Sequence, residues 1–268
     1  HCSSAISLPV GHLPASLRTL TILGLKNLEF QTQHKHESLE SLSIYNSCDS
    51  LTSLPLVTFP NLKSLRIENC ENIKSLLVSG SESVKSLSSF QIIRCPSFAS
   101  FPREGLPAPN LIRFKGEKLK SLPDQMSSLL PKLEALDISN CPEIESFPGG
   151  GMPPNLRSVR IGNCEKLLSG LAWPSMAMLT SLDVHGPCDD IKSFPKEGLL
   201  PRSLTSLLLS GFSSLETLDC QGLHHLTSLQ NLAIIQCQKL ENVEGERLPV
   251  SILKLSYIHA LCCKNYYA

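Results

Sequence analysis

The hydrophobic positions of this chain repeat at a nearly constant interval. Each unit has an apolar residue, two others, an apolar residue, one other, an apolar residue, two others and usually a cysteine, as in Leu62-x-x-Leu65-x-Ile67-x-x-Cys70. The units begin at Leu17, Leu39, Leu62, Leu87, Leu111, Leu133, Leu156, Leu179, Leu204, Leu229 and Ile252, a mean spacing of 23.5 residues. Such a period is typical of a solenoid, in which each unit packs only against its neighbours.

Within a unit, the spacing predicts one short strand and a return arm. Leu65 and Ile67 are two residues apart, so they point to one side of a strand, and Arg66 points to the other. The expected fold class is an α/β-type solenoid, a leucine-rich repeat horseshoe with a parallel concave β-sheet and mostly irregular or 3-10 convex arms. We expect the array, of about eleven repeats, over residues 1–259 and an irregular C-terminal tail over 260–268.

Three units depart from the consensus. Those at Leu39 and Leu179 carry an extra residue before the cysteine, and the unit at Leu111 is three residues short and has no cysteine. A change in curvature or a bulge is expected there, either as drift in a tolerant array or as a functional kink. The first residues match the second half of a repeat, so we expect the array to begin mid-repeat, as part of a longer protein.

Charge and cysteine usage narrow the class of protein. The chain has 24 basic and 24 acidic residues, so its charge does not favour nucleic acid or an acidic membrane as a partner. No apolar run approaches the roughly 20 residues needed to span a bilayer. A ladder of cysteines at one repeat position favours reduced, buried thiols and a cytoplasmic protein, with the nucleus as the other expected location. Its members are Cys48, Cys70, Cys95, Cys141, Cys164, Cys188 and Cys237.

Motifs for catalysis are lacking. There is no Gly-x-x-x-x-Gly-Lys-Ser/Thr phosphate loop, and the Gly149-Gly-Gly-Met-Pro-Pro154 run indicates a linker. His34-Lys-His36-Glu37 lacks the second histidine of a zinc helix motif, and Cys262-Cys263 has no nearby pair with metal spacing. We therefore expect no enzyme activity, no metal and no cofactor in this chain.

The concave face is the candidate binding surface, because a stack of like units makes an extended face and not a pocket. Its outward positions carry charged and aromatic side chains, which suit protein recognition and electrostatic steering. The first half of this face reads as locally basic, and a solvated face with scattered charge is the competing interpretation. The predicted partner-binding residues are Tyr45, Lys63, Arg66, Arg94, Arg113, Lys115, Asp137, Arg160, Asp183 and His185.

The repeat phrase, with linkers such as Phe101-Pro-Arg-Glu-Gly-Leu-Pro-Ala-Pro-Asn-Leu111, resembles the C-terminal repeats of plant intracellular immune receptors. These are the nucleotide-binding leucine-rich-repeat disease resistance proteins, and the likeness is greatest to the coiled-coil class. The resemblance implies that the repeats sense a pathogen effector, or a host protein that the effector modifies. It also implies that they hold the receptor's own nucleotide-binding domain inactive, and that ATP or ADP binds only in that upstream domain.

Two other functions remain open at the level of sequence. Cysteine-bearing leucine-rich repeats also form the substrate-adaptor domain of ubiquitin ligases, and an F-box upstream of His1 would favour that function. An enzyme domain built on repeats is the third hypothesis, but it needs a catalytic cysteine domain that this sequence lacks.

Overall fold

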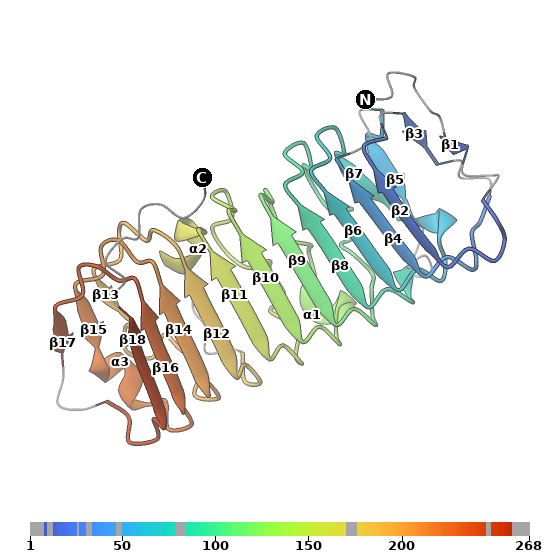
Figure 1. The fold of residues 1–268 in the computed structure, drawn as a ribbon. Helices are drawn as coiled ribbons and strands as arrows, with labels where there is room; N and C mark the ends of the chain where they lie inside the picture. Colours follow the sequence, from blue (N-terminus) through green and yellow to red (C-terminus); the bar gives the residue numbers. More distant parts are fainter. Residues whose placement is uncertain are drawn as a thin grey trace. The chain divides into compact units, whose positions relative to one another are not determined.

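The computed structural model describes residues 8–9, 13–25, 27–30, 34–46, 50–78, 84–169, 176–244 and 248–258. The chain divides into two compact units, residues 1–156 and 157–268. In both, the chain winds as a coil in which a five-residue strand, a tight turn and a return arm follow one another (Figure 1). Each of these main strands begins two residues after the apolar residue that marks its repeat. The predicted parallel-sheet solenoid with few helices is confirmed.

The main sheet of the first unit holds equivalent residues of successive repeats side by side. Leu65 pairs with Leu42 on one side and with Phe90 on the other. Because the register never slips in these pairs, every inward residue of one repeat stacks on its counterpart in the next. The strands, parallel and in chain order, are β2 (Thr19–Leu23), β4 (Ser41–Tyr45), β6 (Ser64–Glu68), β8 (Ser89–Ile93), β9 (Arg113–Glu117) and β10 (Ala135–Ser139).

The second unit repeats this arrangement. Arg160 pairs with Asp183, Asp183 with Leu208 and Leu208 with Ala233, so the outward residues again form one column. The strands are β11 (Ser158–Gly162), β12 (Ser181–His185), β14 (Ser206–Ser210), β16 (Asn231–Ile235) and β18 (Lys254–Ile258).

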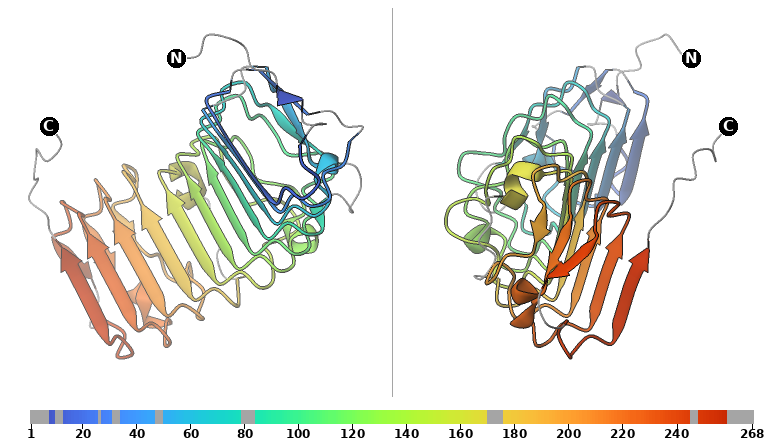
Figure 2. Two further views of the ribbon diagram at one scale, coloured as in Figure 1. Left: turned by 45° about the vertical axis from the view of Figure 1, so that its right-hand side comes forward. Right: turned by 90° about the vertical axis from the view of Figure 1, so that its left-hand side faces the viewer.

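Where the structure describes the return arms, their regular segments are short (Figure 2). In the first unit these are β1 (Leu8–Pro9), β3 (Leu28–Glu29), β5 (Ser53–Pro55), η2 (Leu56–Thr58), β7 (Ser75–Leu77) and α1 (Met126–Leu129). In the second they are α2 (Glu165–Ser169), β13 (Ser193–Phe194), β15 (Thr217–Asp219), α3 (Cys220–His224) and β17 (Asn242–Glu244). The expectation of mostly irregular arms is therefore confirmed, but the small parallel pairings β1–β3, β5–β7 and β13–β15–β17 were not predicted.

The pairing of Leu8 with Leu28 places Leu8–Pro9 in a return arm, as expected for the second half of a repeat. The predicted tail, 260–268, lies outside the described residues.

Each repeat buries its apolar positions almost completely. In the repeat that begins at Leu62, the residues Leu65, Ile67, Cys70 and Ile73 are at most 1% exposed. Burial of this extent contributes about 1.5–3 kcal/mol for each large side chain, which offsets the loss of chain entropy on folding. Because the residues of each repeat also stack on those of its neighbours, the array folds as a stack and not as separate repeats.

The cysteine ladder is buried and reduced. Cys70, Cys95, Cys141, Cys164, Cys188 and Cys237 are free and buried, whereas the predicted rung Cys48 lies outside the described residues. The thiol of most of these rungs donates to the carbonyl of the last strand residue, as from Cys141 to Ser139 at 3.1 Å. Burial, with Glu165 and Asp189 nearby, raises the pKa of Cys188 to about 12. The hydrogen bond with the Cys70 side chain, together with burial, raises the pKa of Cys95. The thiols of Cys95 and Cys188 therefore stay protonated and unreactive at neutral pH.

The described residue directly after a main strand has a left-handed backbone. In ten successive repeats its φ lies between 45° and 120°. This conformation lets the residue's N–H donate to the last strand carbonyl of the next repeat, as from Asn69 to Ile93 at 2.9 Å. Asparagine and glycine tolerate it best. The residues are Gly24, Asn46, Asn69, Arg94, Lys118, Asn140, Asn163, Gly186, Gly211 and Gln236, and we call these positions the turn column.

In the short repeat at Leu111, the Leu119 side chain fills the space that a larger inward residue occupies in neighbouring repeats. Gly116 occupies the inward position that Ile92 and Ile138 hold in the adjacent strands. A Cβ atom on Gly116 would overlap Leu119 Cδ1 and lie 3.0 Å from Leu119 Cγ, so Leu119 fills the missing volume. Leu119 is 2% exposed, and its N–H donates to Cys141 Sγ at 3.3 Å. Strand β9 keeps its register with both neighbours, so the expected bulge does not form in this strand.

Candidate protein-binding surface

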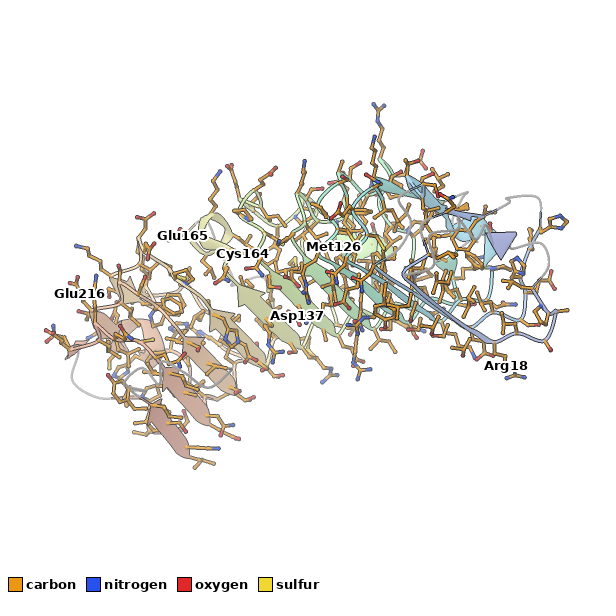
Figure 3. All side chains as sticks on the ribbon, turned by 45° about the horizontal axis from the view of Figure 1, so that its top comes forward. Arg18, Met126, Asp137, Cys164, Glu165 and Glu216 are labelled. Carbon is orange, nitrogen blue, oxygen red and sulfur yellow. The ribbon has the colours of Figure 1, made fainter. Side chains whose placement is uncertain are left out.

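The outward face of the first unit consists of three columns of side chains, from the first, third and fifth residues of its main strands. The central column runs Thr21, Ser43, Arg66, Gln91, Lys115 and Asp137, as the repeat spacing predicts. Asp137, on β10, is labelled in Figure 3, with Met126 on the return-arm helix α1. The outermost column adds Tyr45, Glu68 and Glu117.

Four charged residues of this face form a continuous network. Arg66 Nε and Nη2 donate to Glu68 Oε2 at 3.1 and 2.6 Å. Arg94 Nη2 lies 3.3 Å from Glu68 Oε1, and its Nε lies 3.6 Å from Glu117 Oε2. Asn140 Nδ2 donates to Glu117 Oε1 at 3.2 Å, which ties the network to the turn column. Arg66 and Glu68 belong to one strand, whereas the contacts of Arg94 with Glu68 and Glu117 join neighbouring repeats, so the complete network forms only in the stack.

Tyr45 orients the first arginine of the network. The guanidinium carbon of Arg66 lies 5.5 Å from the centre of the Tyr45 ring, a cation–π contact. The ring and Glu68 together hold Arg66 in one orientation. Tyrosine and arginine are the residue types enriched where binding energy concentrates in protein interfaces.

Three further ion pairs between described residues lie on or beside the face. Lys115 Nζ lies 3.1 Å from Asp137 Oδ2 on the next strand. Lys63, directly before β6, lies 3.1 Å from Glu40, which also pairs with Arg18 at 3.5 Å. Among the described residues, no ion pair is recorded for the exposed Arg113.

The cations of the network are more exposed to solvent than the carboxylates with which they pair. The side chains of Glu68 and Glu117 are 14% and 16% exposed, whereas Arg66 and Arg94 are 38% and 52% exposed. The expectation of a locally basic first half was wrong in its simple form, because carboxylates that the sequence reasoning overlooked neutralise much of the charge. The signal was available, since Glu68 is two residues after Arg66 and therefore points to the same side of the strand.

In the second unit the outward face is less charged. Arg160 donates to Asp183 Oδ2 through Nη2 at 2.9 Å and through Nε at 3.3 Å. The same column continues with Leu208 and Ala233. His185 is half-buried, and its Nε2 atom is buried without a hydrogen-bond partner among the described atoms.

The described residues of the two units contain no group of three or more histidine, cysteine, aspartate or glutamate side chains placed to hold a metal ion. An open hollow of about 670 Å³ in the second unit is lined by loop residues together with Gln221, His224 and His225 of the α3 region. Within the described ranges, every helix is too short to cross a membrane.

Parallel strands in register, a tight turn after the strand and a buried cysteine rung in six of the described repeats define a leucine-rich repeat solenoid, a fold that points to protein interaction. The chain is 38% identical to an Arabidopsis thaliana protein named "putative disease resistance protein", in an alignment that covers 95% of this chain and 19% of that protein. The chain thus spans about one fifth of the relative's length. No family model matches the chain.

Solved structures with leucine-rich repeats are also similar. The leucine-rich repeat domain of the type III effector XopL is 22% identical, with a TM-score of 0.41, over 91% of this chain and 69% of that one. An internalin from Listeria monocytogenes is 15% identical, with a TM-score of 0.31, over 87% of this chain and 88% of that one. At these TM-scores the likeness says nothing about function.

Proposed function

We propose that this chain is the protein-recognition segment of a plant disease resistance receptor, and that its outward face binds a pathogen effector or a host protein that the effector modifies. The observation that carries the proposal is the 38% identity, across nearly the whole chain, to a plant protein named "putative disease resistance protein". The face itself supports it, because the sheet presents an oriented arginine, an aromatic ring and a charge network.

We further propose that the array restrains an upstream nucleotide-binding domain, with cytoplasmic or nuclear residence. The test is transient expression, in leaves, of the full-length product of the gene that encodes this chain, with and without residues 1–259. An autoinhibitory array predicts that the deletion alone triggers cell death and ion leakage. A full-length protein with Ile138→Asp, which places a charge in the core, should behave like the deletion.

Two results would contradict the proposal. If neither the deletion nor the core variant changes basal cell death, the array does not restrain a switch. If the full-length product carries an F-box and co-purifies with a ubiquitin-ligase scaffold, the adaptor function replaces the receptor function.

A further inference from the structure

Two adjacent repeats place long cations where the backbone favours asparagine or glycine. Seven of the ten turn-column residues are asparagine or glycine. Arg94 and Lys118, with φ of 51° and 60°, are exceptions in consecutive repeats of the first unit. The left-handed region is disfavoured for side chains of this kind, so each residue carries a conformational cost that asparagine would reduce.

The two residues differ in what offsets this cost. Arg94 forms ion pairs with Glu68 and Glu117, whose side chains are only 14% and 16% exposed, so these pairs offset part of its cost, although Arg94 itself is 52% exposed. For the exposed side chain of Lys118, no hydrogen bond or ion pair is recorded among the described residues, and only its backbone N–H is bonded, to Ser139 O at 3.0 Å. Backbone strain that no stabilising contact offsets is typical of positions that serve function.

Arg94 lies beside a third cation, Arg66, that is already oriented, and Lys118 occupies the position equivalent to Arg94 in the next repeat. Adjacent strands are about 4.8 Å apart, so equivalent positions of successive repeats are near neighbours. Arg66 shares Glu68 with Arg94 and stacks on Tyr45. We call Arg66, Arg94 and Lys118 the strand-end cation cluster. Its cations lie above the carboxylates, so an approaching molecule meets positive charge first.

We propose that the strand-end cation cluster is the docking site for an acidic segment of a partner protein, whose aspartate or glutamate carboxylates bind Arg66, Arg94 and Lys118. Charge complementarity identifies the partner, since planar guanidinium groups match carboxylates. The half-buried Glu68 and Glu117 orient the arginines and moderate the charge. The inference rests on the proposed function for its assumption that this face binds a protein.

The test uses the whole chain and a defined probe, a fluorescein-labelled deca-glutamate peptide, followed by fluorescence anisotropy at about 20 mM salt, where screening is weak. Lys118→Asn combined with Arg94→Asn gives each position the residue that its backbone prefers. We expect the dissociation constant for the peptide to rise about three- to tenfold, the range for the loss of two exposed charge contacts. The melting temperature of the Lys118→Asn single variant should stay unchanged or rise.

Two control variants separate charge from backbone. Gln236→Asn makes the same backbone change in the turn column of the second unit without removing charge. Lys74→Asn removes an exposed lysine on a return arm. Both should leave the affinity for the peptide within about twofold of the parent chain, below the three- to tenfold change expected of the double variant.

Three results would overturn the proposal. The first is an unchanged peptide affinity in the double variant. The second is a lower melting temperature for Lys118→Asn, since the lysine would then have a structural role. The third is equally tight, equally variant-sensitive binding of a ten-nucleotide thymidine oligomer, which would make the cluster a general polyanion site. None of these measurements needs receptor activity, so this inference and the proposed function can fail independently.

Discussion

Because Leu119 fills the space beside Gly116, we expect the effects of substitutions at these two positions on the free energy of unfolding to be strongly coupled. Gly116→Ile restores the consensus inward residue, but the new side chain would enter space that Leu119 already fills. Overpacking of this kind costs about 1–3 kcal/mol. Leu119→Cys restores the consensus rung, but it leaves a cavity beside Gly116 and should cost about 2 kcal/mol or more.

The double variant, Gly116→Ile with Leu119→Cys, rebuilds the packing of the neighbouring repeats. Ile138 and Cys141 in the next repeat have the same spacing and are fully buried, so the combination is known to fit this stack. We expect the double variant to lie within about 1 kcal/mol of the parent chain, with a coupling energy of about 2–3 kcal/mol. Gly116 has no positive φ, so isoleucine meets no backbone obstacle there.

Urea unfolding followed by far-ultraviolet circular dichroism, under reducing conditions, measures the free energy of unfolding of the four proteins. A shared slope against urea concentration makes the values comparable. If the losses of the two single variants simply add in the double variant, Leu119 does not compensate for Gly116, and the explanation of this repeat is refuted.

Further predictions concern the turn column, the core and the cysteine ladder. Gly211→Ala should lower the free energy of unfolding by about 1–2 kcal/mol from its positive φ alone. Gly186→Ala should lower it by at least about 3 kcal/mol, because its φ is 120° and its Cβ would lie 2.8 Å from the backbone nitrogen of Asn163. Equal losses for the two variants in urea unfolding would contradict this. Ile138→Asp should cost at least about 4 kcal/mol by burying an unpaired charge, and a loss below about 1 kcal/mol would show that the position is not a core site. The pKa of Cys188 rises from 9.0 to about 12 on folding, so its contribution to stability is complete below about pH 9 and is lost as pH rises towards about 12. Alkylation of this thiol at pH 8, followed by mass spectrometry, should be much slower in the native chain than in urea.

The strands and the core could be predicted from the sequence because both depend on spacing within one repeat. An alternation such as Leu65-Arg66-Ile67 fixes which side chains point inward, and a recurrence every 23.5 residues fixes what they stack on. The turn column escaped prediction because its cause is a hydrogen bond to the following repeat. The recurrence of asparagine or glycine shortly before the rung position could have indicated the left-handed turn.

The candidate surface could be predicted only in part. The positions of Arg66, Lys115 and Asp137 followed from alternation, and the structure places them in one column. Their partners did not follow, since the ion pair between Arg94 and Glu68 joins residues 26 apart in sequence. Whether these residues bind a partner stays a prediction, which the charge variants test.

The sequence by itself determined the repeat, its inward face and the parallel register, because hydrophobic spacing acts locally and is copied from unit to unit. Only the tertiary structure decided that Leu119 replaces a missing isoleucine, that Glu68 and Glu117 lie beneath the arginines, and that Arg94 and Lys118 carry a left-handed backbone. Each of these depends on side chains or carbonyl groups of adjacent repeats, which become neighbours only when the stack forms.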